Sequence, residues 1–573
     1  MSIKKIGATT NLSDDECIKE RSRHLRGTLI ESLGDSITGA LAEDDTHLSK
    51  FHGIYQQDDR DVRSERKRQR LEPAYSFMIR VRVPGGVCTT EQWLSMDEIA
   101  LTKANGSIRL TTRQAFQLHG VIKGNLKPAI QGINQALMDT LAACGDVNRN
   151  VMCSPMPPLS NVHRKVQAYA ESLSEHLTPA TGAYHEIWLD GKKLQNMESE
   201  VEPIYGDTYL PRKFKSAFVI PPQNDVDVYA QDLGFIAIVE QGVLRGFNVT
   251  VGGGMGMSHG NTATYPRLAD IMGFCTVDQV NAVAEAVVIT QREFGDRTNR
   301  EHARLKYTID DHGLDWFRNQ VERCLEWRLQ KPRQFTFVGN GDVFGWQQSM
   351  DENWHYTLFV QNGRILDAGN RLLMKGLRKI ATVHKGDLRL TPNQNLIISN
   401  VSSGDREQIT DVLHEFGIEN SQQISPLRLH SMACVAFPTC GLAMAESERY
   451  LPALIDRIEK RLDVHGIGDE AITIRMTGCP NGCARPYIAE IGLVGKGPDH
   501  YNLYLGASFA GDRLNKLYRE NINEEEILAS LDPLFASYAD ERNDGEHFGD
   551  FIVRTGAVAE VTAGKEFHLD ASK

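Results

Sequence analysis

Short runs of alternating apolar and polar residues, each bounded by turn residues, dominate the first part of the chain. Residues 77–83 alternate strictly, which places Arg80 and Arg82 on one face of a predicted strand and Ile79, Val81 and Val83 on the other. Pro84-Gly85-Gly86 ends this strand. Thr89, followed three residues later by Gln92, predicts a capping box and therefore a helix that begins at this point.

The same kind of pattern continues along the chain. It predicts a strand over 107–110, a helix near 128–141 and a further strand over 216–220, with Lys213 and Lys215 on one face of the extended run that precedes it. The long, regular βαβ rhythm of a dinucleotide-binding fold is missing. The pattern therefore predicts an α/β (α+β) protein with mixed sheets.

An internal repeat organises the chain. Residues 106–121 align with 386–401, with Gly, Arg, Leu, Thr, Gln and Val in register, and residues 150–153 align with 431–434 after a shift of one residue. Two matches in the same order indicate duplication of a whole unit. The alternative is a single strand–turn pattern that happens to recur.

The two copies differ at positions suited to chemistry. Arg113 of the first copy corresponds to Asn393 of the second, and the lone Cys153 corresponds to Cys434, the first residue of a cysteine cluster. We therefore expect one half to have kept anion-binding side chains and the other to hold a metal cluster.

Charge and composition exclude several classes of protein. The 573 residues carry a formal net charge of −12, which argues against nucleic acid as the main partner. Residues 1–25 do not resemble a secretory signal, and no apolar run is long enough to span a membrane, so we expect a cytoplasmic protein. Residues 1–75, with a dense mixed-charge run at 58–70, form a predicted N-terminal arm. This arm is either a solvated wrap or a docking surface for a partner.

Four of the ten cysteines occur in two close pairs. They are Cys434 with Cys440, and Cys479 with Cys483. Four thiolates suit either zinc or an iron–sulfur cluster, but neither pair has the Cys-x2-Cys spacing of a zinc knuckle. The wider gaps, with adjacent prolines and glycines, favour a polynuclear iron–sulfur cluster. The remaining alternative is four buried cysteines that pair by coincidence.

Basic residues of the first half form a second candidate group. These are Arg82, Arg113, Arg149, Lys213 and Lys215. Any one of them alone would be interpreted as a surface charge, but together they predict a pocket that neutralises an oxyanion or a carboxylate-rich ligand.

Motifs for other cofactors are missing. The loop 252–256 lacks the glycine spacing of a dinucleotide fingerprint, and close packing against a flat cofactor explains it better. We find no phosphate-binding loop and no flavin or nicotinamide motif. Electrons would therefore have to come from another protein.

Several motifs together resemble a known family. Cys434-x5-Cys440 with residues 477–483 (Thr-Gly-Cys-Pro-Asn-Gly-Cys), and also residues 51–60 and 210–215, are similar to the siroheme-dependent sulfite and nitrite reductases over nearly the whole chain. The resemblance implies a three-lobed, pseudo-two-fold duplicated fold with cofactors at the lobe junction. The domains that it implies are an arm (1–75), a ferredoxin-like interface domain (76–145 with 347–424), a siroheme- and anion-binding half (146–346) and a cluster half (425–573).

The resemblance also implies cofactors and residue roles. Siroheme would lie beside a 4Fe–4S cluster held by the four paired cysteines, with Cys483 bridging the cluster and the siroheme iron. Cations of the first half would bind sulfite and relay protons (Arg82, Arg149, Lys213 and Lys215). Arg113 would pair with siroheme carboxylates, and His119 and Asn481 would lie near the cofactors.

The implied activity is the six-electron reduction of sulfite to sulfide. The implied partner is an NADPH-dependent flavoprotein reductase subunit in a hetero-oligomer, with ferredoxin as the alternative donor. Two rival functions remain open at this point: nitrite reduction with the same cofactors, and a non-redox protein with a purely structural metal site.

Overall fold

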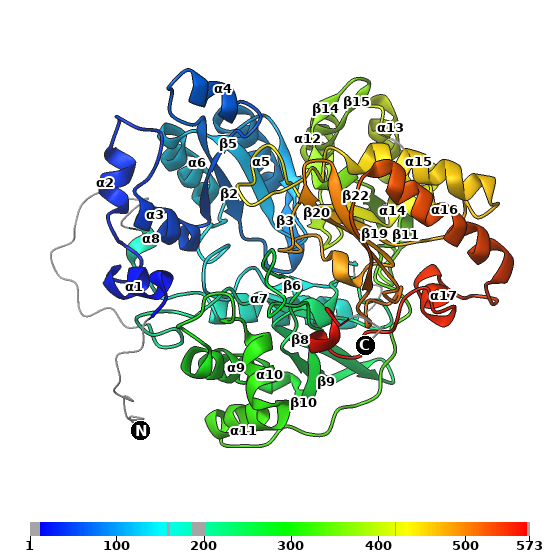
Figure 1. Cartoon of the computed structure of the whole chain (residues 1–573). Helices are drawn as coiled ribbons and strands as arrows, with labels where there is room; N and C mark the ends of the chain where they lie inside the picture. Colours follow the sequence, from blue (N-terminus) through cyan, green and yellow to red (C-terminus); the bar gives the residue numbers. More distant parts are fainter. Residues whose placement is uncertain (1–11, 157–160, 186–201, 419, 570–573) are drawn as a thin grey trace.

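Four five-stranded sheets carry the fold, two of them antiparallel and two mixed. They are seen in the part of the chain that the computed structural model describes, residues 12–156, 161–185, 202–418 and 420–569. The elements form lobes that meet near the middle of the molecule (Figure 1). A small two-stranded sheet accompanies them, formed by β14 (Asp367–Ala368) and β15 (Arg371–Leu372).

Each large sheet combines strands that are not all consecutive in the sequence. In spatial order, the first contains β1 (Ile54–Asp58), β2 (Tyr75–Val81), β5 (Phe116–Val121), β4 (Ile108–Leu110) and β13 (Arg364–Ile365). The second contains β11 (Gly345–Gln348), β12 (Trp354–Leu358), β17 (Leu396–Val401), β16 (Asp387–Leu390) and β3 (Val87–Thr89). The third contains β10 (Asp270–Thr276), β9 (Val243–Val251), β8 (Leu233–Glu240), β7 (Ser216–Val219) and β6 (Met152–Cys153). The fourth contains β18 (Ser431–Ala433), β19 (Ile474–Thr477), β20 (Ile491–Gly497), β21 (His500–Leu505) and β22 (Lys516–Ile522).

The first two sheets exchange their edge strands. β13, from the second half of the sequence, pairs with β4 of the first sheet, and β3, from the first half, pairs with β16 of the second sheet. The third and fourth sheets share another design, because each begins with two parallel pairings (β6–β7–β8 and β18–β19–β20) and continues with two antiparallel ones. The duplicated fold predicted from the repeat is therefore confirmed.

The repeated segments also share their local hydrogen bonds. The Thr111 hydroxyl accepts from the backbone N–H groups of Arg113 and Ala115, each at 3.2 Å. Thr391, its counterpart, accepts from the N–H groups two and four residues later at 3.2 and 3.0 Å. The same turn thus presents Arg113 in one half and Asn393 in the other.

Helices cover the sheets on their outer faces (Figure 1). The helices of the first half are α1 (Asp14–Arg21), α2 (Leu29–Gly34), α3 (Glu43–Leu48), α4 (Arg63–Arg68), α5 (Thr90–Lys103), α6 (Lys123–Gln135), α7 (Asn161–His176), α8 (Ala183–His185), α9 (Val280–Phe294), α10 (Leu305–His312) and α11 (Leu314–Leu325). Those of the second half are α12 (Leu373–Val383), α13 (Arg406–Glu415), α14 (Pro426–Leu429), α15 (Leu451–Val464), α16 (Glu524–Glu541) and α17 (Phe548–Arg554).

Two helix predictions can be compared with the structure. The predicted capping box is present at α5, because Thr89 accepts from the Gln92 N–H and the Gln92 side chain accepts in return. The helix predicted near 128–141 begins earlier, at Lys123, and contains Pro128 in its second turn. Proline has no backbone N–H, so this turn of the helix lacks one of its hydrogen bonds.

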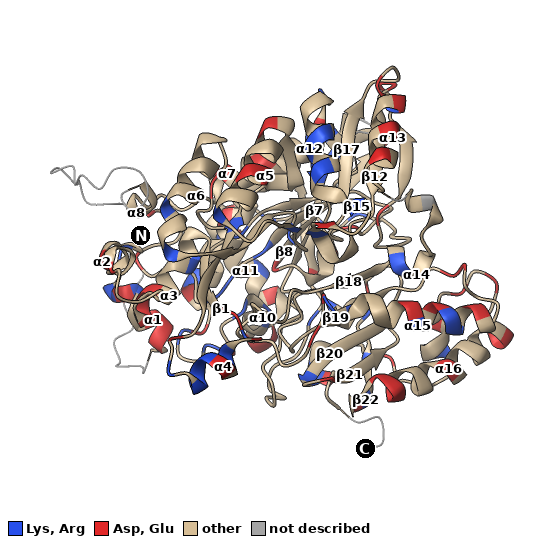
Figure 2. Ribbon diagram, turned by 90° about the horizontal axis from the view of Figure 1, so that it is seen from above, with Lys and Arg blue, Asp and Glu red and all other residues tan. Residues whose placement is uncertain are grey.

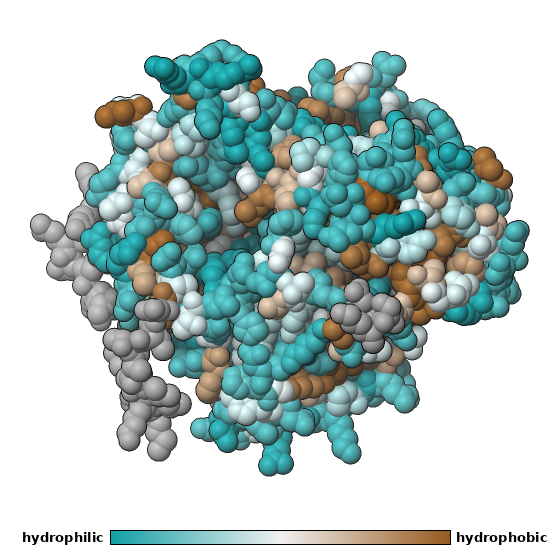
Figure 3. All heavy atoms as spheres, in the orientation of Figure 1, coloured by the Kyte–Doolittle hydropathy of each residue, from teal (hydrophilic) through white to brown (hydrophobic). Residues whose placement is uncertain are grey.

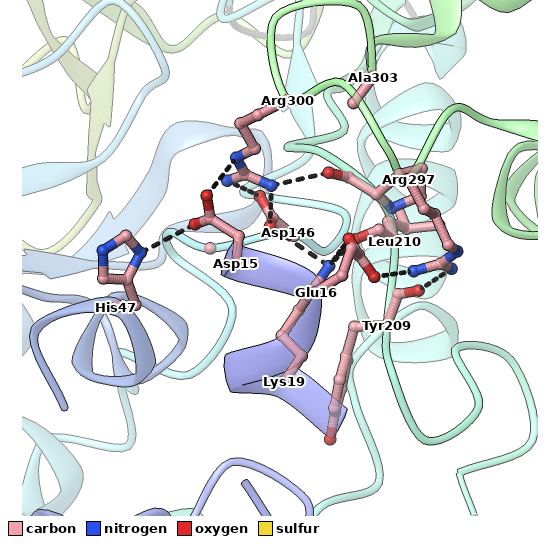
Figure 4. A network of polar contacts seen from close by, with 12 residues as sticks. Asp15, Glu16, Lys19, His47, Asp146, Tyr209, Leu210, Arg297, Arg300 and Ala303 are labelled. Atoms are coloured by element: carbon pink, nitrogen blue, oxygen red, sulfur yellow. Dashed lines mark hydrogen bonds and ion pairs between the residues drawn. The ribbon is translucent and has the colours of Figure 1, made fainter. Parts of the chain in front are cut away.

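The described part of the N-terminal segment is anchored to the body of the protein. Glu16 and Lys19 of α1 are buried, and the Lys19 Nζ donates to the Leu210 carbonyl at 2.7 Å. Arg297 reaches Glu16 at 2.5 Å, and Asp146 lies 3.6 Å from Lys19 (Figure 4). The prediction of a separate arm therefore needs correction for α1, because buried ion pairs fix this helix against the third sheet's lobe.

The surface differs from place to place. Lys and Arg side chains gather on α4, none of whose residues is buried (Figure 2). The face in Figure 3 is mainly hydrophilic and is hollowed where the lobes meet. Within the described residues, every helix is too short or too polar to span a bilayer.

Candidate active site

The cysteine loops leave neighbouring parallel strands at the same edge of the fourth sheet. Cys434 directly follows β18, and Cys479 comes two residues after β19. The Gly478 N–H points at the Cys434 Sγ at 3.3 Å, and the Cys434 N–H donates to the Met476 carbonyl at 3.1 Å. Parallel strands bring their carboxyl ends to one edge, so the fold itself brings these two distant cysteine segments together.

The four sulfurs lie close enough to influence one another. Burial, with the neighbouring sulfurs of Cys483 and Cys440, raises the pKa of the Cys434 thiol to about 12. Burial and Cys483 likewise raise the pKa values of Cys440 and Cys479. Yet no three His, Cys, Asp or Glu side chains in the described residues converge where they could hold a single metal ion. The spacing of the two cysteine pairs along the sequence, wider than a zinc knuckle, fits a polynuclear cluster better than one zinc ion.

The backbone around these thiols requires glycine. A Cβ on Gly478 would lie 2.6 Å from the Ala445 carbonyl oxygen. Gly482 has a φ of +61°, and the Met255 carbonyl oxygen would lie 3.1 Å from an added Cβ. The glycine loop at 252–256 thus packs on the second cysteine loop, and the Met257 N–H donates to the Pro480 carbonyl at 3.0 Å.

The structure brings four of the predicted basic residues together. The Arg149 N–H donates to the Phe214 carbonyl at 3.0 Å, which places Arg149 between Lys213 and Lys215 on the neighbouring segment. Arg113 donates to the carbonyls of Asn150 and, at 3.3 Å, Ser216, the residues that follow Arg149 and Lys215.

Burial controls the charge of these side chains. It lowers the pKa of Lys213 well below the usual lysine value, and Arg212 and Arg304 lower it further. Burial and Lys213 lower the pKa of Lys215 in the same way. Burial and Arg149 lower the pKa of Arg113 to about 9, so its guanidinium remains protonated at neutral pH.

This group carries more positive charge than its protein neighbours neutralise. Neither Lys213 nor Lys215 makes a hydrogen bond or ion pair with a side chain in the described ranges. Arg113 contacts carbonyl oxygens and the Gln231 amide, and its buried Nε has no partner there. Clustered, partly desolvated cations without carboxylates are costly unless an anion binds, so these residues fit a carboxylate-rich cofactor and an oxyanion. Cys483 lies beside these cations, as the effect of its sulfur shows: it counteracts the lowering of the Lys213 pKa.

Arg82 does not join this group. Its guanidinium forms an ion pair with Asp139 at 2.7 Å and donates to the Thr178 hydroxyl. β2 ends at Val81, and the Arg82 N–H bonds instead to the Asp139 carbonyl at 2.9 Å. The alternation expected over 77–83 continues through Val83, but the pairing partner changes at Arg82, whose side chain meets Asp139 and Thr178 instead of the cation group.

Arg80, which the sequence pattern did not single out, occupies the expected place. Its positive charge acts on Arg113, Arg109 and His119, and its Nη1 lies 3.0 Å from the Cys144 Sγ. The alternating pattern contained both arginines, but nothing in the sequence showed that Arg82 would pair with Asp139.

Two further predicted residues have defined surroundings. His119 is buried in β5, where burial and the neighbouring Arg364 hold its pKa well below the usual value, so it is neutral at physiological pH. The Asn481 Nδ2 lies 3.7 Å from the Cys479 Sγ, which places this amide against the cluster sulfur.

Two further basic residues, Arg304 and Lys306, were not predicted from the sequence. Arg304 forms a bidentate ion pair with Asp232 at 2.9 Å, and Lys306 donates to the Gly256 carbonyl at 2.8 Å. Their Arg-x-Lys spacing, similar to the Lys213-x-Lys215 spacing, was the available signal.

Comparisons with known proteins agree with this architecture. A family model described as a nitrite/sulfite reductase ferredoxin-like half domain matches residues 69–136 and 347–416. A model described as a nitrite and sulphite reductase 4Fe-4S domain matches residues 169–329, a range without any of the four paired cysteines. The solved structure of Mycobacterium tuberculosis NirA protein shares the fold, with a TM-score of 0.76 and 22% identity over 96% of this chain and 98% of that chain. The fold and site thus define a duplicated nitrite/sulfite reductase protein.

Individual relatives of high sequence identity show which members of this family the chain resembles in sequence and length. A sulfite reductase (NADPH) hemoprotein beta-component from Oceanobacillus iheyensis is 60% identical over 97% of this chain and 96% of the relative. One from Staphylococcus saprophyticus is 58% identical over 99% and 100%. The chain belongs to the family of sulfite reductase hemoprotein beta-components.

Proposed function

We propose that this chain is the catalytic hemoprotein of an assimilatory sulfite reductase. The observation that carries the proposal is the group of cations without carboxylate partners, Arg113, Arg149, Lys213 and Lys215, beside Cys483. The family membership and the names of the relatives support it. The complete reaction uses six electrons and seven protons to convert sulfite to hydrogensulfide and three waters.

The chain's own residues define where the cofactors would be held. The four paired cysteines would ligate a 4Fe–4S cluster, and Cys483, the one closest to the cations, would also ligate the siroheme iron. Arg113 would face siroheme carboxylates through its free Nε. Bound together, the two cofactors supply low-potential electrons one after another.

The cations would bind sulfite and manage protons. Arg149 and Arg80 hold fixed positive charge, which suits the oxyanion and compensates the negative charge that enters with each electron. Lys213 and Lys215, whose pKa values are lowered, can give up a proton near the reacting oxygen more readily than ordinary lysines.

The experiment that tests the function uses the purified, cofactor-loaded chain. Absorption and EPR spectra are recorded with and without sulfite, and turnover of sulfite and nitrite is measured side by side with a reduced viologen dye. Heme absorption that sulfite perturbs, with sulfite turned over more efficiently than nitrite, supports the proposal. Efficient turnover of nitrite alone would establish the rival reductase, and zinc without iron or heme would establish the structural metal site.

The placement of Arg80, rather than Arg82, in the anion site can be tested by mutation. We expect Arg80→Met to lower kcat/KM for sulfite about 100- to 1,000-fold, because a positioned cation is lost from the anion site. Arg82→Met is expected to spare turnover and to lower thermal stability, since it breaks the ion pair with Asp139. Steady-state kinetics and thermal unfolding of both variants provide the test, and the reverse result would restore Arg82 to the site.

The lysines predict a pH dependence. A lysine is protonated at pH values below its pKa, and the proposed roles of Lys213 and Lys215 require the protonated form. Because their pKa values are lowered, turnover is expected to fall as the pH rises through a range well below the usual lysine pKa. We expect Lys215→Arg to flatten this alkaline limb, because arginine keeps its charge, while lowering kcat overall, because it is a poor proton donor. The pH profile of kcat, measured with a dye donor, checks this, and an unchanged limb in the variant would assign the titration to another group.

We propose that electrons come from a flavoprotein reductase subunit, which itself takes them from NADPH. This subunit would dock at the N-terminal segment of the chain. The segment touches the cluster loop, because the Arg60 N–H donates to the Pro438 carbonyl at 3.1 Å and its Nη1 to the Cys440 carbonyl at 3.2 Å. The exposed basic helix α4 follows directly. All ten cysteines are free, which supports a reducing, cytoplasmic setting.

Charge reversal on α4 and at Arg70, two residues after this helix ends, tests this docking site. Lys67→Glu combined with Arg70→Glu is expected to slow association with the flavoprotein in a salt-dependent way, because surface charges mainly govern the rate of encounter. Lys460→Glu, at an exposed position of α15, is the matched control. Surface plasmon resonance at two salt concentrations measures the effect, and equal binding by all three proteins would place the docking surface elsewhere.

A further inference from the structure

A buried carboxylate lies where the lobes meet, outside the proposed anion site. Asp227 is fully buried and precedes the short 3₁₀ helix η4 (Val228–Ala230). Its Oδ2 accepts from the Arg475 Nη1 at 2.8 Å and from the Arg485 Nε. One carboxylate from the third sheet's lobe thus forms ion pairs with two arginines from the fourth sheet's lobe.

Arg485 contacts both halves of the repeat at equivalent positions. Its Nη1 donates to the Thr112 carbonyl at 2.9 Å, and its Nη2 donates to the Pro392 carbonyl at 3.0 Å. Thr112 and Pro392 are counterparts, because each is six residues after the glycine that opens its copy of the repeat, Gly106 or Gly386. The guanidinium therefore lies between the two related turns. Only a planar group with donors in several directions can reach all three acceptors.

The same contacts determine the place of the last cluster cysteine. The Thr112 hydroxyl donates to the Cys483 carbonyl at 3.0 Å, so Thr112 binds both Cys483 and Arg485. The Arg485 N–H closes the cysteine loop by donating to the Gly482 carbonyl at 2.9 Å. Arg485 itself has a φ of +55°, an unusual conformation for a residue other than glycine that surrounding contacts must hold.

The backbone of Asp227 also connects this region to the cation group. The Gln231 Nε2 donates to the Asp227 backbone carbonyl at 3.2 Å, and the Gln231 Oε1 accepts from the Arg113 Nη1 at 2.7 Å. A continuous series of contacts thus runs from Cys483 through Arg485, Asp227 and Gln231 to Arg113.

We infer that Arg485, held by Asp227, is a positioning residue that sets Cys483 against the anion-binding cations. The inference rests on the proposed function, because it assigns the geometry of that same site. Arg485 would touch no reacting atom. It acts through the turn at Thr112 and the loop that carries Cys483.

The test uses Arg485→Lys in the full, cofactor-loaded chain. Lysine keeps the charge beside Asp227 but cannot reach both Thr112 and Pro392. We expect iron and siroheme contents close to those of the unvaried protein, a shifted heme absorption band and an altered EPR spectrum. We also expect kcat to fall about 100-fold, the effect of a displacement of about 1 Å in a catalytic site, with little change in the KM for sulfite.

The matched control is Arg428→Lys, a change at an ion pair between α14 and α15, at the opposite end of β18 from Cys434. It is expected to leave both spectra and kcat unchanged. If Arg485→Lys is insoluble, Thr112→Val decides, because it removes only the hydroxyl bonded to Cys483, and shifted spectra with a reduced kcat support the inference. If Arg485→Lys, or Thr112→Val in its place, has the spectra and the kcat of the unsubstituted protein, the inference about Arg485 is overturned. Lack of heme and iron in the unvaried protein would instead refute the proposed function.

Discussion

Replacement of Cys483 by serine is expected to abolish sulfite reduction and remove the heme absorption bands from the purified protein. The sulfur of Cys483 lies close enough to Lys213 to act on its pKa, which places this cysteine beside the cations. A serine hydroxyl at this position is a poor ligand for iron compared with a thiolate. Absorption spectra, iron content and dye-linked turnover measure the effect.

The matched control is Cys153→Ser. Cys153 is buried and corresponds to Cys434 in the repeat, but it lies in the half without the cluster. We expect this variant to keep its iron, its heme bands and its turnover. Normal heme absorption and turnover in Cys483→Ser would refute the role of Cys483 as the shared ligand.

The second large effect is expected when Lys213 and Lys215 are replaced, one at a time, by methionine. Methionine is close to lysine in length and shape but carries no charge and no proton. We expect kcat to fall about 100- to 10,000-fold for each variant, the range found when a positioned acid or base is lost. Sulfite should also bind more weakly, because the variants contribute less positive charge.

Stability separates this catalytic effect from a structural one. Removal of a partly desolvated cation that has no carboxylate partner should leave the thermal unfolding temperature the same or raise it, because a desolvation cost disappears. Lys306→Met is the contrasting variant, because Lys306 donates to backbone carbonyls of the glycine loop and should lower stability when removed. Full turnover in both Lys213→Met and Lys215→Met would refute the proposed anion site.

Much of the fold was predictable because the signals are local. The Thr89–Gln92 capping box and the strand at 107–110 depend on residues a few positions apart, and the structure contains both. The repeat at 106–121 and 386–401 predicted the duplication because each copy keeps the same turn around its threonine. The exchange of β3 and β13 between the sheets carried no such signal, since very short strands contribute little pattern of their own.

The sequence by itself determined the chemistry available: four paired cysteines with more than zinc-knuckle spacing, and a set of basic residues in the opposite half. Residue type and spacing along the chain are enough for that inference. The tertiary structure alone decided which of these residues meet. Arg80 rather than Arg82 lies with the cations because Arg82 pairs with Asp139. Arg485 lies between the two repeated turns because three separate segments, at Thr112, Pro392 and Asp227, converge on its guanidinium. Strand ends and contacts between distant segments depend on the packing of the whole chain, which no local pattern records.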